Sequence, residues 1–344
     1  MDVIALKEYL KDEPDKIEQL LHSVDFCNIK RNSSRQEIRC SRDYDRNPTS
    51  VVIKYGSENI PFTCFSTGLS GDIISLIQNK LNTSFRNVLK YMYSTLGLSD
   101  DALVPIERYL PFGAYYKKIQ SKNSIKDIDL QTYPDEIMND FKMSPNMLFL
   151  RDGISIDTQI KYNVGYDSTT MRVSVPWYNH NEEIVGVMGR INTQFPDADI
   201  SKWLPIIPFA KSKAIYGYSL NYSDIQNKKI CMIGESEKLP QQLDSMGYKT
   251  GASVGGSNIS SYHQRYLKSL NAEKYILMFD EGLTEDKIRS EAEKLQAQNV
   301  FQQYQVGYIF DRYNEILKSG SKMAPTDLGK MAFKELYNNH IVWL

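Results

Sequence analysis

Two short apolar runs, each followed closely by an acidic residue, constrain the fold of this chain more than any other feature of its sequence. The first covers residues 230–233 and leads through one glycine to Glu235, and the second covers residues 275–279 and leads directly to Asp280. Short apolar runs that are bounded by turn residues and separated by helical stretches are typical of buried parallel strands. Side chains just past the carboxyl ends of such strands lie at one edge of the sheet. We therefore predict an α/β sheet that brings Glu235 and Asp280 together.

Two neighbouring carboxylates at a sheet edge can hold a divalent cation. Mg²⁺ prefers oxygen ligands and keeps several coordination positions for water and substrate phosphates. On spacing alone, Glu235 and Asp280 could equally be ordinary polar ends of strands. A metal site and polar strand ends are equally good interpretations at this point.

Length, composition and charge narrow the class of protein. A chain of 344 residues predicts two or three domains, and 41% hydrophobic with 24% charged residues is typical of a globular protein. The formal net charge of −1 gives no chain-wide signature for nucleic acid, so any basic surface must be local. Four cysteines without a paired framework, and no signal peptide, indicate a reducing, cytoplasmic setting. No apolar run approaches the roughly 20 residues that a membrane helix needs, so we expect no membrane partner.

The first 100 residues predict a small α+β domain. Residues 2–29 have apolar side chains at helical spacing on both sides of Pro14, which separates two helices. From Glu37 onward the pattern changes to short strands with tight turns that lead into a helix near Asp72. Cys40 and Cys64 are expected in two of these turns, and two cysteines alone are more often small buried hydrophobes than metal ligands.

The order of motifs in this segment resembles the N-terminal zinc ribbon of DnaG-type primases. The matching motifs are Cys40-Ser-Arg-Asp43, Asn47-Pro48-Thr49-Ser50, Cys64-Phe65-Ser66-Thr67 and Ser70-Gly71-Asp72. The resemblance implies zinc ligands at Cys40, Asp43 and Cys64. Asp43 stands where the family has histidine, and Thr67 stands where it has the last cysteine, whereas structural Zn²⁺ takes four nitrogen or sulfur ligands. We therefore expect a zinc-ribbon-like domain that has lost its zinc and is stabilised by core packing instead.

A basic block follows a polar stretch. Residues 101–132 lack strong periodicity and are expected to be an interdomain linker. Beyond them, the candidates for contact with nucleotide and template are Arg190, Lys202, Lys211 and Lys213. Arginine offers a bidentate fork to phosphate and lysine offers a point charge, although each lysine taken singly could be an ordinary surface charge.

This block resembles the amino-terminal half of the RNA-polymerase domain of DnaG-type primases. The matching motifs are Gly153-Ile154-Ser155, Gly165-Tyr166, Gly189-Arg190, Lys202-Trp203-Leu204 and the stretch from Lys211 to Tyr216-Gly217. The resemblance implies that its arginine and lysines grip the template and the incoming triphosphate.

The stretch that contains Glu235 and Asp280 resembles the Toprim fold, which DnaG-type primases share with topoisomerases and some nucleases. The fold's motifs are a glutamate after the first strand, a glycine turn, and an Asp-x-Asp after a later strand. They are matched by Glu235, by Gly255-Gly256-Ser257 and by Asp280-Glu281-Gly282. The resemblance implies that backbone amides of Gly255 and Gly256, at the start of a helix, hold phosphate.

Departures from the family pattern leave the third metal ligand open. Gly282 stands at the second aspartate position, and Leu239 replaces an aspartate that many relatives carry four residues after the glutamate. Glu281 or Asp327 is then the next candidate, although an aspartate at 327 could simply cap the helix that follows. Asp311, which ends another strand-like run, is a further acidic candidate.

The resemblances cover nearly the whole chain in the family's order, and they imply a DNA primase of the compact phage or mobile-element type. Its parts would be an α+β zinc-ribbon-like domain (1–100), a linker (101–132), the first part of an α/β RNA-polymerase domain (133–222) and a Toprim subdomain with C-terminal helices (223–344). Such a nucleotidyltransferase, a DNA-directed RNA polymerase, makes short RNA primers from ribonucleoside triphosphates on single-stranded DNA. Mg²⁺ or Mn²⁺ would be its cofactor, a replicative helicase its expected partner, and the cytoplasm of a bacterial host its location if a phage encodes it.

Two alternatives stay open. The lost zinc ligands, Leu239 and Gly282 favour a catalytically degenerate primase-like protein that binds DNA or acts as a replisome scaffold. A Toprim nuclease would use the same carboxylates to cut DNA, but the basic block from 202 to 213 argues against it.

Overall fold

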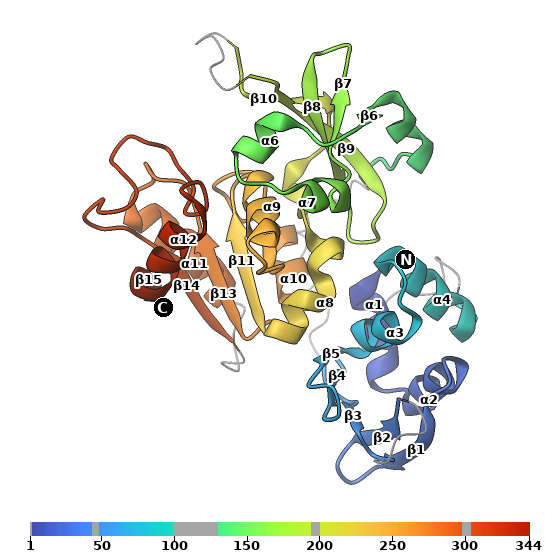
Figure 1. Ribbon diagram of the computed structural model, residues 1–344. Coiled ribbons are helices and arrows are strands. Elements are labelled where there is room, and N and C mark those ends of the chain that lie inside the picture. The colour runs from blue at the N-terminus through green and yellow to red at the C-terminus, as the bar shows by residue number, and fades with distance from the viewer. Residues whose placement is uncertain (1, 43–47, 99–129, 194–199, 298–303) are drawn as a thin grey trace, which may run out of the picture.

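In the part of the chain that the structure describes, three five-stranded sheets follow one another (Figure 1). The computed structural model describes residues 2–42, 48–98, 130–193, 200–297 and 304–344, and the architecture is mixed α/β. Residues 101–129 of the predicted linker lie outside the described residues. Each sheet falls inside one of the three domains predicted from the sequence, but the predicted boundary between residues 222 and 223 falls inside a helix, α8 (Tyr218–Lys228). The division into domains therefore stays a prediction.

The N-terminal module, residues 2–42 and 48–98, packs four helices against an antiparallel sheet with the order β1-β2-β3-β4-β5. Its capping residues explain where the helices begin: the Asp2 carboxylate accepts hydrogen bonds from two amides of α1, and Asp72 forms a capping box with Ser75 at the start of α3. The elements are α1 (Val3–Lys11), α2 (Pro14–Ser23), β1 (Cys27–Asn32), β2 (Glu37–Ser41), β3 (Val51–Lys54), β4 (Pro61–Cys64), β5 (Ser70–Asp72), α3 (Ile73–Leu81) and α4 (Phe85–Leu96).

The expectation that Cys40 and Cys64 occupy turns is wrong. Cys40 lies inside β2 and Cys64 ends β4, and both side chains are buried. Val51 of β3 lies between them in the strand register, opposite each in turn. These cysteines therefore act as small apolar residues of the sheet's inner face.

The middle module carries a second antiparallel sheet with the order β10-β9-β8-β7-β6. Its two longest strands are buried along almost their whole length, which matches their nearly continuous apolar sequences. The elements are η1 (Asp135–Asp140), β6 (Lys142–Met143), α6 (Met147–Arg151), α7 (Ile156–Lys161), β7 (Gly165–Asp167), β8 (Arg172–Tyr178), β9 (Ile184–Ile191), β10 (Trp203–Ile207) and η2 (Lys211–Lys213).

The third sheet has the order β12-β11-β13-β14-β15. Its first four strands are parallel, and β15 pairs with β14 in the antiparallel direction. The predicted parallel strands at 230–233 and 275–279 are therefore confirmed as direct neighbours, with Gly234 opposite Met278. Besides α8, the elements are β11 (Ile230–Gly234), α9 (Lys238–Ser245), β12 (Gly251–Ser253), α10 (Ser261–Ser269), β13 (Lys274–Met278), α11 (Glu285–Gln296), β14 (Gln305–Ile309), α12 (Gly329–Asn339) and β15 (Ile341–Trp343).

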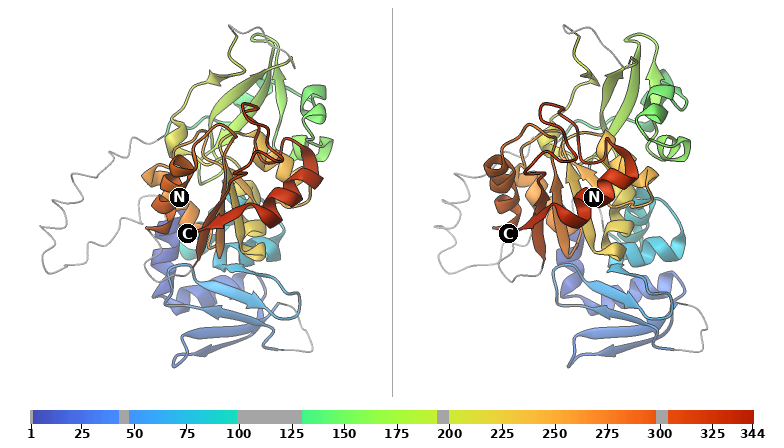
Figure 2. Two further views of the ribbon diagram at one scale, coloured as in Figure 1. Left: turned by 90° about the vertical axis from the view of Figure 1, so that its left-hand side faces the viewer. Right: turned by 60° about the vertical axis from the view of Figure 1, so that its left-hand side comes forward.

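One hydrophobic core joins the N-terminal module to the third sheet. Leu6 of α1 and Phe85 of α4 belong to the same buried cluster as Tyr222 of α8 and Ile233 of β11. The rings of Phe85 and Tyr222 lie 4.6 Å apart between centroids. Figure 2 shows the N-terminal module in blue beside α8, in agreement with the contacts of α8 to β5, α3 and α4. The module and the sheet are thus held in one arrangement by apolar packing.

Within the part of the chain that the structure describes, no helix is both long and apolar enough to cross a membrane.

Candidate active site

The structure brings Glu235 and Asp280 together at the carboxyl edge of the third sheet. Glu235 directly follows β11, and Asp280 lies two residues past β13. The backbone amide of Asp280 donates a hydrogen bond of 2.9 Å to Oε1 of Glu235. The pairing follows from the parallel register, which ends two adjacent strands at the same level.

The electrostatics of this pair are unbalanced. Burial raises the pKa of Asp280 to about 7, with the nearby charges of Glu235 and Asp327 acting in the same direction. Burial also raises the pKa of Glu235. Oδ1 of Asp280 is buried and has no hydrogen-bond partner among the described residues. A buried carboxylate oxygen without a partner is costly, so this edge favours a proton or a cation.

Asp327 approaches the same edge from the turn before α12. Its Oδ1 accepts hydrogen bonds of 3.0 Å from Nζ of Lys238 and from the amide of Gln242, and its Oδ2 accepts one of 2.9 Å from the backbone of Ala324. Burial would raise the pKa of Asp327, but Lys238 and these donors hold it below the ordinary value. The alternative that Asp327 caps α12 is wrong, because the residue at the cap position is Leu328 and no described side chain caps this helix.

Glu281 and Asp311 are not part of the pair. The carboxylate of Glu281 accepts hydrogen bonds from the backbone amides of Gly320 and Lys322, and so fastens a loop. Asp311 accepts three backbone amides between residues 315 and 317, which closes the loop after β14. Among the residues that the structure describes, no group of three or more His, Cys, Asp or Glu side chains could hold a metal ion.

Glu235 and Asp280 nevertheless fit the ligand chemistry of Mg²⁺. Together they supply two carboxylates, one with a buried oxygen that no described residue engages. Mg²⁺ is commonly held by one or two carboxylates, with substrate phosphates and waters completing the shell. The roles of Glu281 and Asp327 as metal ligands stay predictions.

Lys211 is the basic candidate with the most defined surroundings. Its Nζ lies 3.1 Å from Oε1 of Glu237 and 5.3 Å from the ring centre of Trp177, which itself donates to Glu237. Gly255 lies beside Lys211 and Trp177, and its backbone has a φ angle of +72°. A Cβ atom added to Gly255 would lie 2.8 Å from the Lys211 side chain. Two of the candidate residues, Lys211 and Gly255, are therefore neighbours.

The glycine turn is not the start of a helix, contrary to expectation. Helix α10 begins only at Ser261, where Ser260 and His263 form a capping box. The amide of Gly255 donates to Oγ of Ser253 at 3.1 Å, and the described residues leave open space beside the Cα of Gly256. A phosphate-binding role for Gly255 and Gly256 stays a prediction.

The other basic candidates differ in exposure. Arg190 ends the buried part of β9 and donates to the carbonyl of Ile191 at 3.1 Å; burial lowers the pKa of its guanidinium. Lys202 is exposed just before β10, and Lys213 ends η2, two residues past Lys211. The four cations therefore lie in different surroundings, and each has to be tested by itself.

Sequence reasoning missed Lys238, Asp152, Glu237 and Trp177. Lys238 forms ion pairs with Asp327 and, at 3.2 Å, with Asp152 of the loop after α6. A signal existed for Lys238 only in its position, three residues after Glu235 at the start of α9. The partners come from distant parts of the chain, which no local pattern connects.

The described part of the chain contains two of the three zinc candidates, Cys40 and Cys64, so the loss of zinc stays a prediction. Asp43 lies outside the described residues, and Cys40 and Cys64 alone give two thiols. Burial raises the pKa of Cys40 to about 12, with Cys64 adding to the effect, whereas burial of Cys64 is outweighed by hydrogen bonds from Ser66 and Thr67, which lower its pKa.

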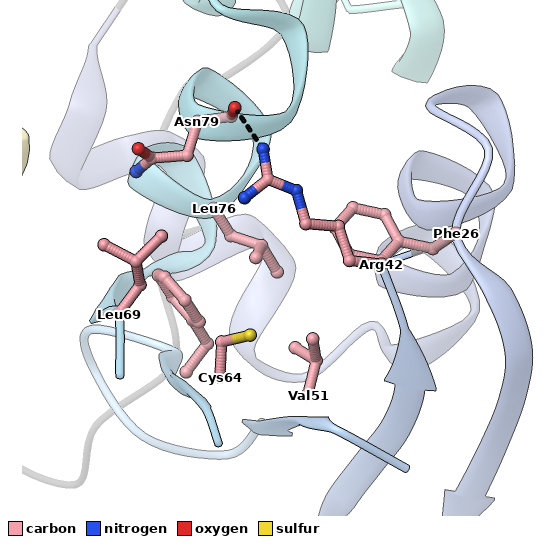
Figure 3. Close-up of a pocket in the computed structure, with 8 residues that line it drawn as sticks. Phe26, Arg42, Val51, Cys64, Leu69, Leu76 and Asn79 are labelled. Carbon is pink, nitrogen blue, oxygen red and sulfur yellow. Dashed lines mark hydrogen bonds between the residues drawn. The ribbon is translucent and has the colours of Figure 1, made fainter. Parts of the chain in front are cut away.

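Figure 3 shows mainly apolar side chains around Cys64. The cavity that they line has a volume of about 10 Å³. Across it, Arg42 donates to the carbonyl of Asn79 at 3.0 Å.

Comparison with known proteins adds an independent line of observation. No protein-family model matches the chain. A DNA primase of Campylobacter jejuni is 22% identical over 300 residues, which is 78% of this chain and 49% of that primase. The chain resembles DnaG-type primases. The SPbeta prophage-derived uncharacterized protein YorJ of Bacillus subtilis is 23% identical over 323 residues, covering 85% of each chain.

Solved primase structures are also similar. The zinc-binding and RNA-polymerase domains of Aquifex aeolicus primase match 98% of this chain and 86% of theirs, with 15% identity and a TM-score of 0.48. A DnaG primase catalytic domain bound to single-stranded DNA matches 60% of this chain and 77% of its own, with 15% identity and a TM-score of 0.44. The match to the curated primase spans about half of that primase's length, so the activity of the whole enzyme is not carried over with it.

Proposed function

We propose that this chain is a compact DNA primase of the DnaG type, whose third sheet is a Toprim fold and which synthesises short RNA primers on single-stranded DNA. The observation that carries the proposal is the contact between Glu235 and Asp280 at the carboxyl ends of adjacent parallel strands. The similarity to a curated DNA primase over most of the chain supports it.

In this proposal the chain's own residues prepare a site for nucleotidyl transfer. Glu235 and Asp280 hold a divalent cation, Mg²⁺ or Mn²⁺, which when bound offsets the charge that develops on the reacting phosphate. The hydrogen bond from the Asp280 amide fixes the Glu235 carboxylate before any cation arrives. The buried setting of Asp280 strengthens its attraction for a cation, because few waters screen it.

The basic residues are proposed to hold the polyanionic reactants. Lys211 is oriented by Glu237 and Trp177 beside the glycine turn, in a position to meet a triphosphate. Lys202, which is exposed, suits a template backbone. Arg190 is buried and engaged with the backbone, so its proposed contact with nucleotide requires the end of its side chain to turn outward.

The N-terminal module is proposed to bind the single-stranded template, by backbone charge and stacking, without zinc. Elemental analysis of the purified chain tests whether zinc is absent. We expect much less than one zinc per chain, and a stoichiometric amount would contradict it. A replicative helicase and ribonucleoside triphosphates complete the proposed set of partners.

A primer-synthesis assay tests the proposal. Labelled ribonucleotides, single-stranded DNA and Mg²⁺ or Mn²⁺ are incubated with the wild-type chain and with Glu235→Ala, and Asp286→Asn serves as an exposed acidic control on α11. We expect primers from the wild type and from the control, and a loss of at least about 100-fold in Glu235→Ala. If none of the three proteins made primers with either Mg²⁺ or Mn²⁺, the proposed enzyme activity would be contradicted.

A degenerate, DNA-holding scaffold is the second candidate, and specific contacts favour it. Backbone amides engage Glu281, and Lys238 engages Asp327, so neither candidate third ligand is available without rearrangement. This candidate predicts binding of single-stranded DNA by wild type and Glu235→Ala alike, with no primers from either. Cutting of the DNA in the same reactions would instead indicate a Toprim nuclease.

A further inference from the structure

Lys238 places a fixed positive charge among the acidic residues of the site. Its Nζ lies 3.0 Å from Oδ1 of Asp327 and 3.2 Å from Oδ2 of Asp152. The Lys238 side chain is 20% exposed, and those of Asp327 and Asp152 are 19% and 24% exposed. An ammonium that is enclosed to this degree by two carboxylates is more than a surface ion pair.

The amide of Gln242 holds this arrangement in place. It donates to Oδ1 of Asp327 at 3.0 Å and to the carbonyl of Asp152 at 2.8 Å. Gln242 in turn accepts a hydrogen bond of 2.6 Å from Thr326. The residues around Lys238 therefore come from α9, from the turn before α12 and from the loop after α6. Gln242 contacts the Asp327 carboxylate and the Asp152 backbone. Among the described residues, in contrast, Oδ2 of Asp152 has only its ion pair with Lys238.

The charges divide the site into two halves. Asp327 and Asp152 form the half that Lys238 neutralises. Glu235 and Asp280 form the other half, where Oδ1 of Asp280 has no partner among the described residues. The charge that compensates Glu235 is that of Lys287, which is itself hydrogen-bonded to Glu291. Among the described residues, Lys238 pairs directly with the carboxylates of the first half, whereas in the second half it acts only from a distance, by lowering the pKa of Asp280 against the effect of burial.

We infer that Lys238 is a built-in cation that takes the place of a second divalent ion, so that the site binds a single divalent ion, at Glu235 and Asp280. The inference rests on the proposed function, because it assigns a role within that metal site. A two-metal site places its ions roughly 4 Å apart, so a second ion needs ligands close to those of the first. Asp327, whose charge acts on Asp280, is paired with the Lys238 ammonium, and Glu281 is held by two backbone amides. A second ion would have to displace these contacts.

Metal stoichiometry tests the inference without any measurement of activity. Mn²⁺ is titrated into the metal-free chain without nucleotide, and bound ions are counted by electron paramagnetic resonance and by calorimetry. We expect one ion in the wild type, two in Lys238→Met, and one again in Lys238→Met/Asp327→Asn. Lys268→Met is the matched control, because Lys268 of α10 forms a surface ion pair with Glu58, away from the site. It should bind one ion.

Each contrary outcome has a distinct meaning. Two ions in the wild type overturn the inference, whether or not the variant folds, and so does an unchanged stoichiometry in a folded Lys238→Met. A third outcome is that the wild type and Lys238→Met each bind one ion and Glu235→Ala binds none. This outcome contradicts the role of Lys238 but is consistent with the proposed function. No bound ion in the wild type overturns the inference and the proposed metal site together.

Discussion

Asp280 determines how the site responds to pH. Burial, together with Glu235 and Asp327, raises its pKa to about 7 in the folded chain. A carboxyl group with a raised pKa binds more protons in the folded state than in the unfolded state between about pH 4 and 7. The free energy of unfolding of the metal-free chain should therefore fall as the pH rises through this window.

The variant Asp280→Asn removes this penalty. In the presence of a chelator we expect it to be more stable than the wild type at pH 8, by on the order of 3 kcal/mol, with the gain vanishing below about pH 4. Urea unfolding across pH 4 to 8 measures the difference, and Asp286→Asn, an exposed residue of α11, is the control. Parallel stability curves for wild type and Asp280→Asn would show that Asp280 titrates normally.

Single residues also show what the sequence can and cannot reveal. Glu235 and Asp280 were found from the sequence because each ends a short apolar run, and the parallel register then brings them together. Lys238 was missed because its partner Asp327 lies 89 residues away along the chain, and a lysine near a glutamate carries no signal of its own. The missed contacts are all long-range, and no periodic pattern encodes those.

At the scale of elements, the glycine turn after β12 depends on one of its two glycines. Gly255 has φ +72°, and a Cβ there would lie 2.8 Å from Cδ of Lys211 and 2.9 Å from Trp177. A Cβ on Gly256 would meet no atom of the described residues within 4 Å beyond its own chain neighbours. The two glycines therefore make a matched pair for mutation.

We expect Gly255→Ala to destabilise the chain by roughly 1–3 kcal/mol, because the left-handed backbone and the close contacts both disfavour a side chain. It should also change the fluorescence of Trp177 through the displaced Lys211. Gly256→Ala should stay within about 0.5 kcal/mol of the wild type. Thermal unfolding and fluorescence spectra compare the two, and equal effects would show that the turn adapts freely.

The elements were more predictable than their ends and their connections. The helix at 85–96 and the hairpin of β8 and β9 follow from apolar periodicity and capping residues that are visible in the sequence. The prediction that a helix starts at Gly255 and Gly256 is wrong, because Ser260 and His263 cap α10 several residues later. Cys40 was expected in a turn and lies in β2, because its pairing with Val51 of β3 is a contact between strands that the local sequence does not reveal.

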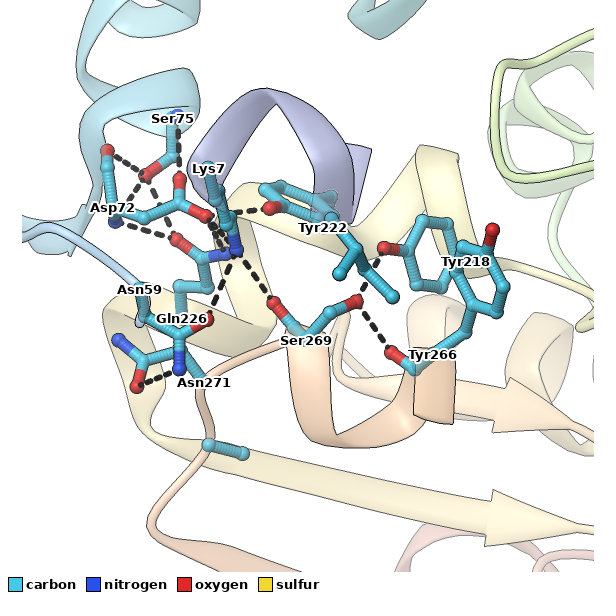
Figure 4. A network of polar contacts seen from close by, with 12 residues as sticks. Lys7, Asn59, Asp72, Ser75, Tyr218, Tyr222, Gln226, Tyr266, Ser269 and Asn271 are labelled. Carbon is cyan, nitrogen blue, oxygen red and sulfur yellow. Dashed lines mark hydrogen bonds and ion pairs between the residues drawn. The ribbon is translucent and has the colours of Figure 1, made fainter. Parts of the chain in front are cut away.

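At the scale of the whole molecule, a buried ion pair inside the N-terminal module hydrogen-bonds to α8 and to the last residue of α10, which fastens the module to the helices beside the third sheet (Figure 4). Nζ of Lys7 lies 2.6 Å from Oδ2 of Asp72, with side chains 3% and 0% exposed. Lys7 also donates to the carbonyl of Ser269 at 2.8 Å, and Asp72 accepts from Tyr222 and Gln226 of α8. Burial lowers the pKa of Lys7, whereas Lys7 holds the pKa of Asp72 below its ordinary value despite burial.

Removal of one partner should be costly. We expect Lys7→Met to lower the free energy of unfolding by about 3–5 kcal/mol, because it leaves the Asp72 charge buried without its cation. The double variant Lys7→Met/Asp72→Asn should recover part of this loss. Urea unfolding of both measures the effect, with Lys16→Met, at a partly exposed lysine of α2, as control. A single variant as stable as the control would show that the pair contributes little.

The shared core also predicts that the two parts unfold together. Cys40 of the N-terminal module and Cys231 of β11 are both fully buried in the same cluster. Pulsed alkylation at increasing urea, read out for each cysteine by mass spectrometry, should give both thiols the same midpoint. Earlier labelling of Cys40 would show that the N-terminal module opens independently.

The shared core has a consequence for where on the template such an enzyme would start a primer. A template strand held by the N-terminal module would lie at a set separation from Glu235 and Asp280, because the module is packed against α8 and is not merely tethered. In the proposed primase, the distance between the template-binding module and the two carboxylates would therefore be fixed. The nucleotide at which a primer starts, relative to the recognised bases, would then be set by the packing of Phe85 against Tyr222 and by the hydrogen bonds that link Lys7 and Asp72 to α8 and α10.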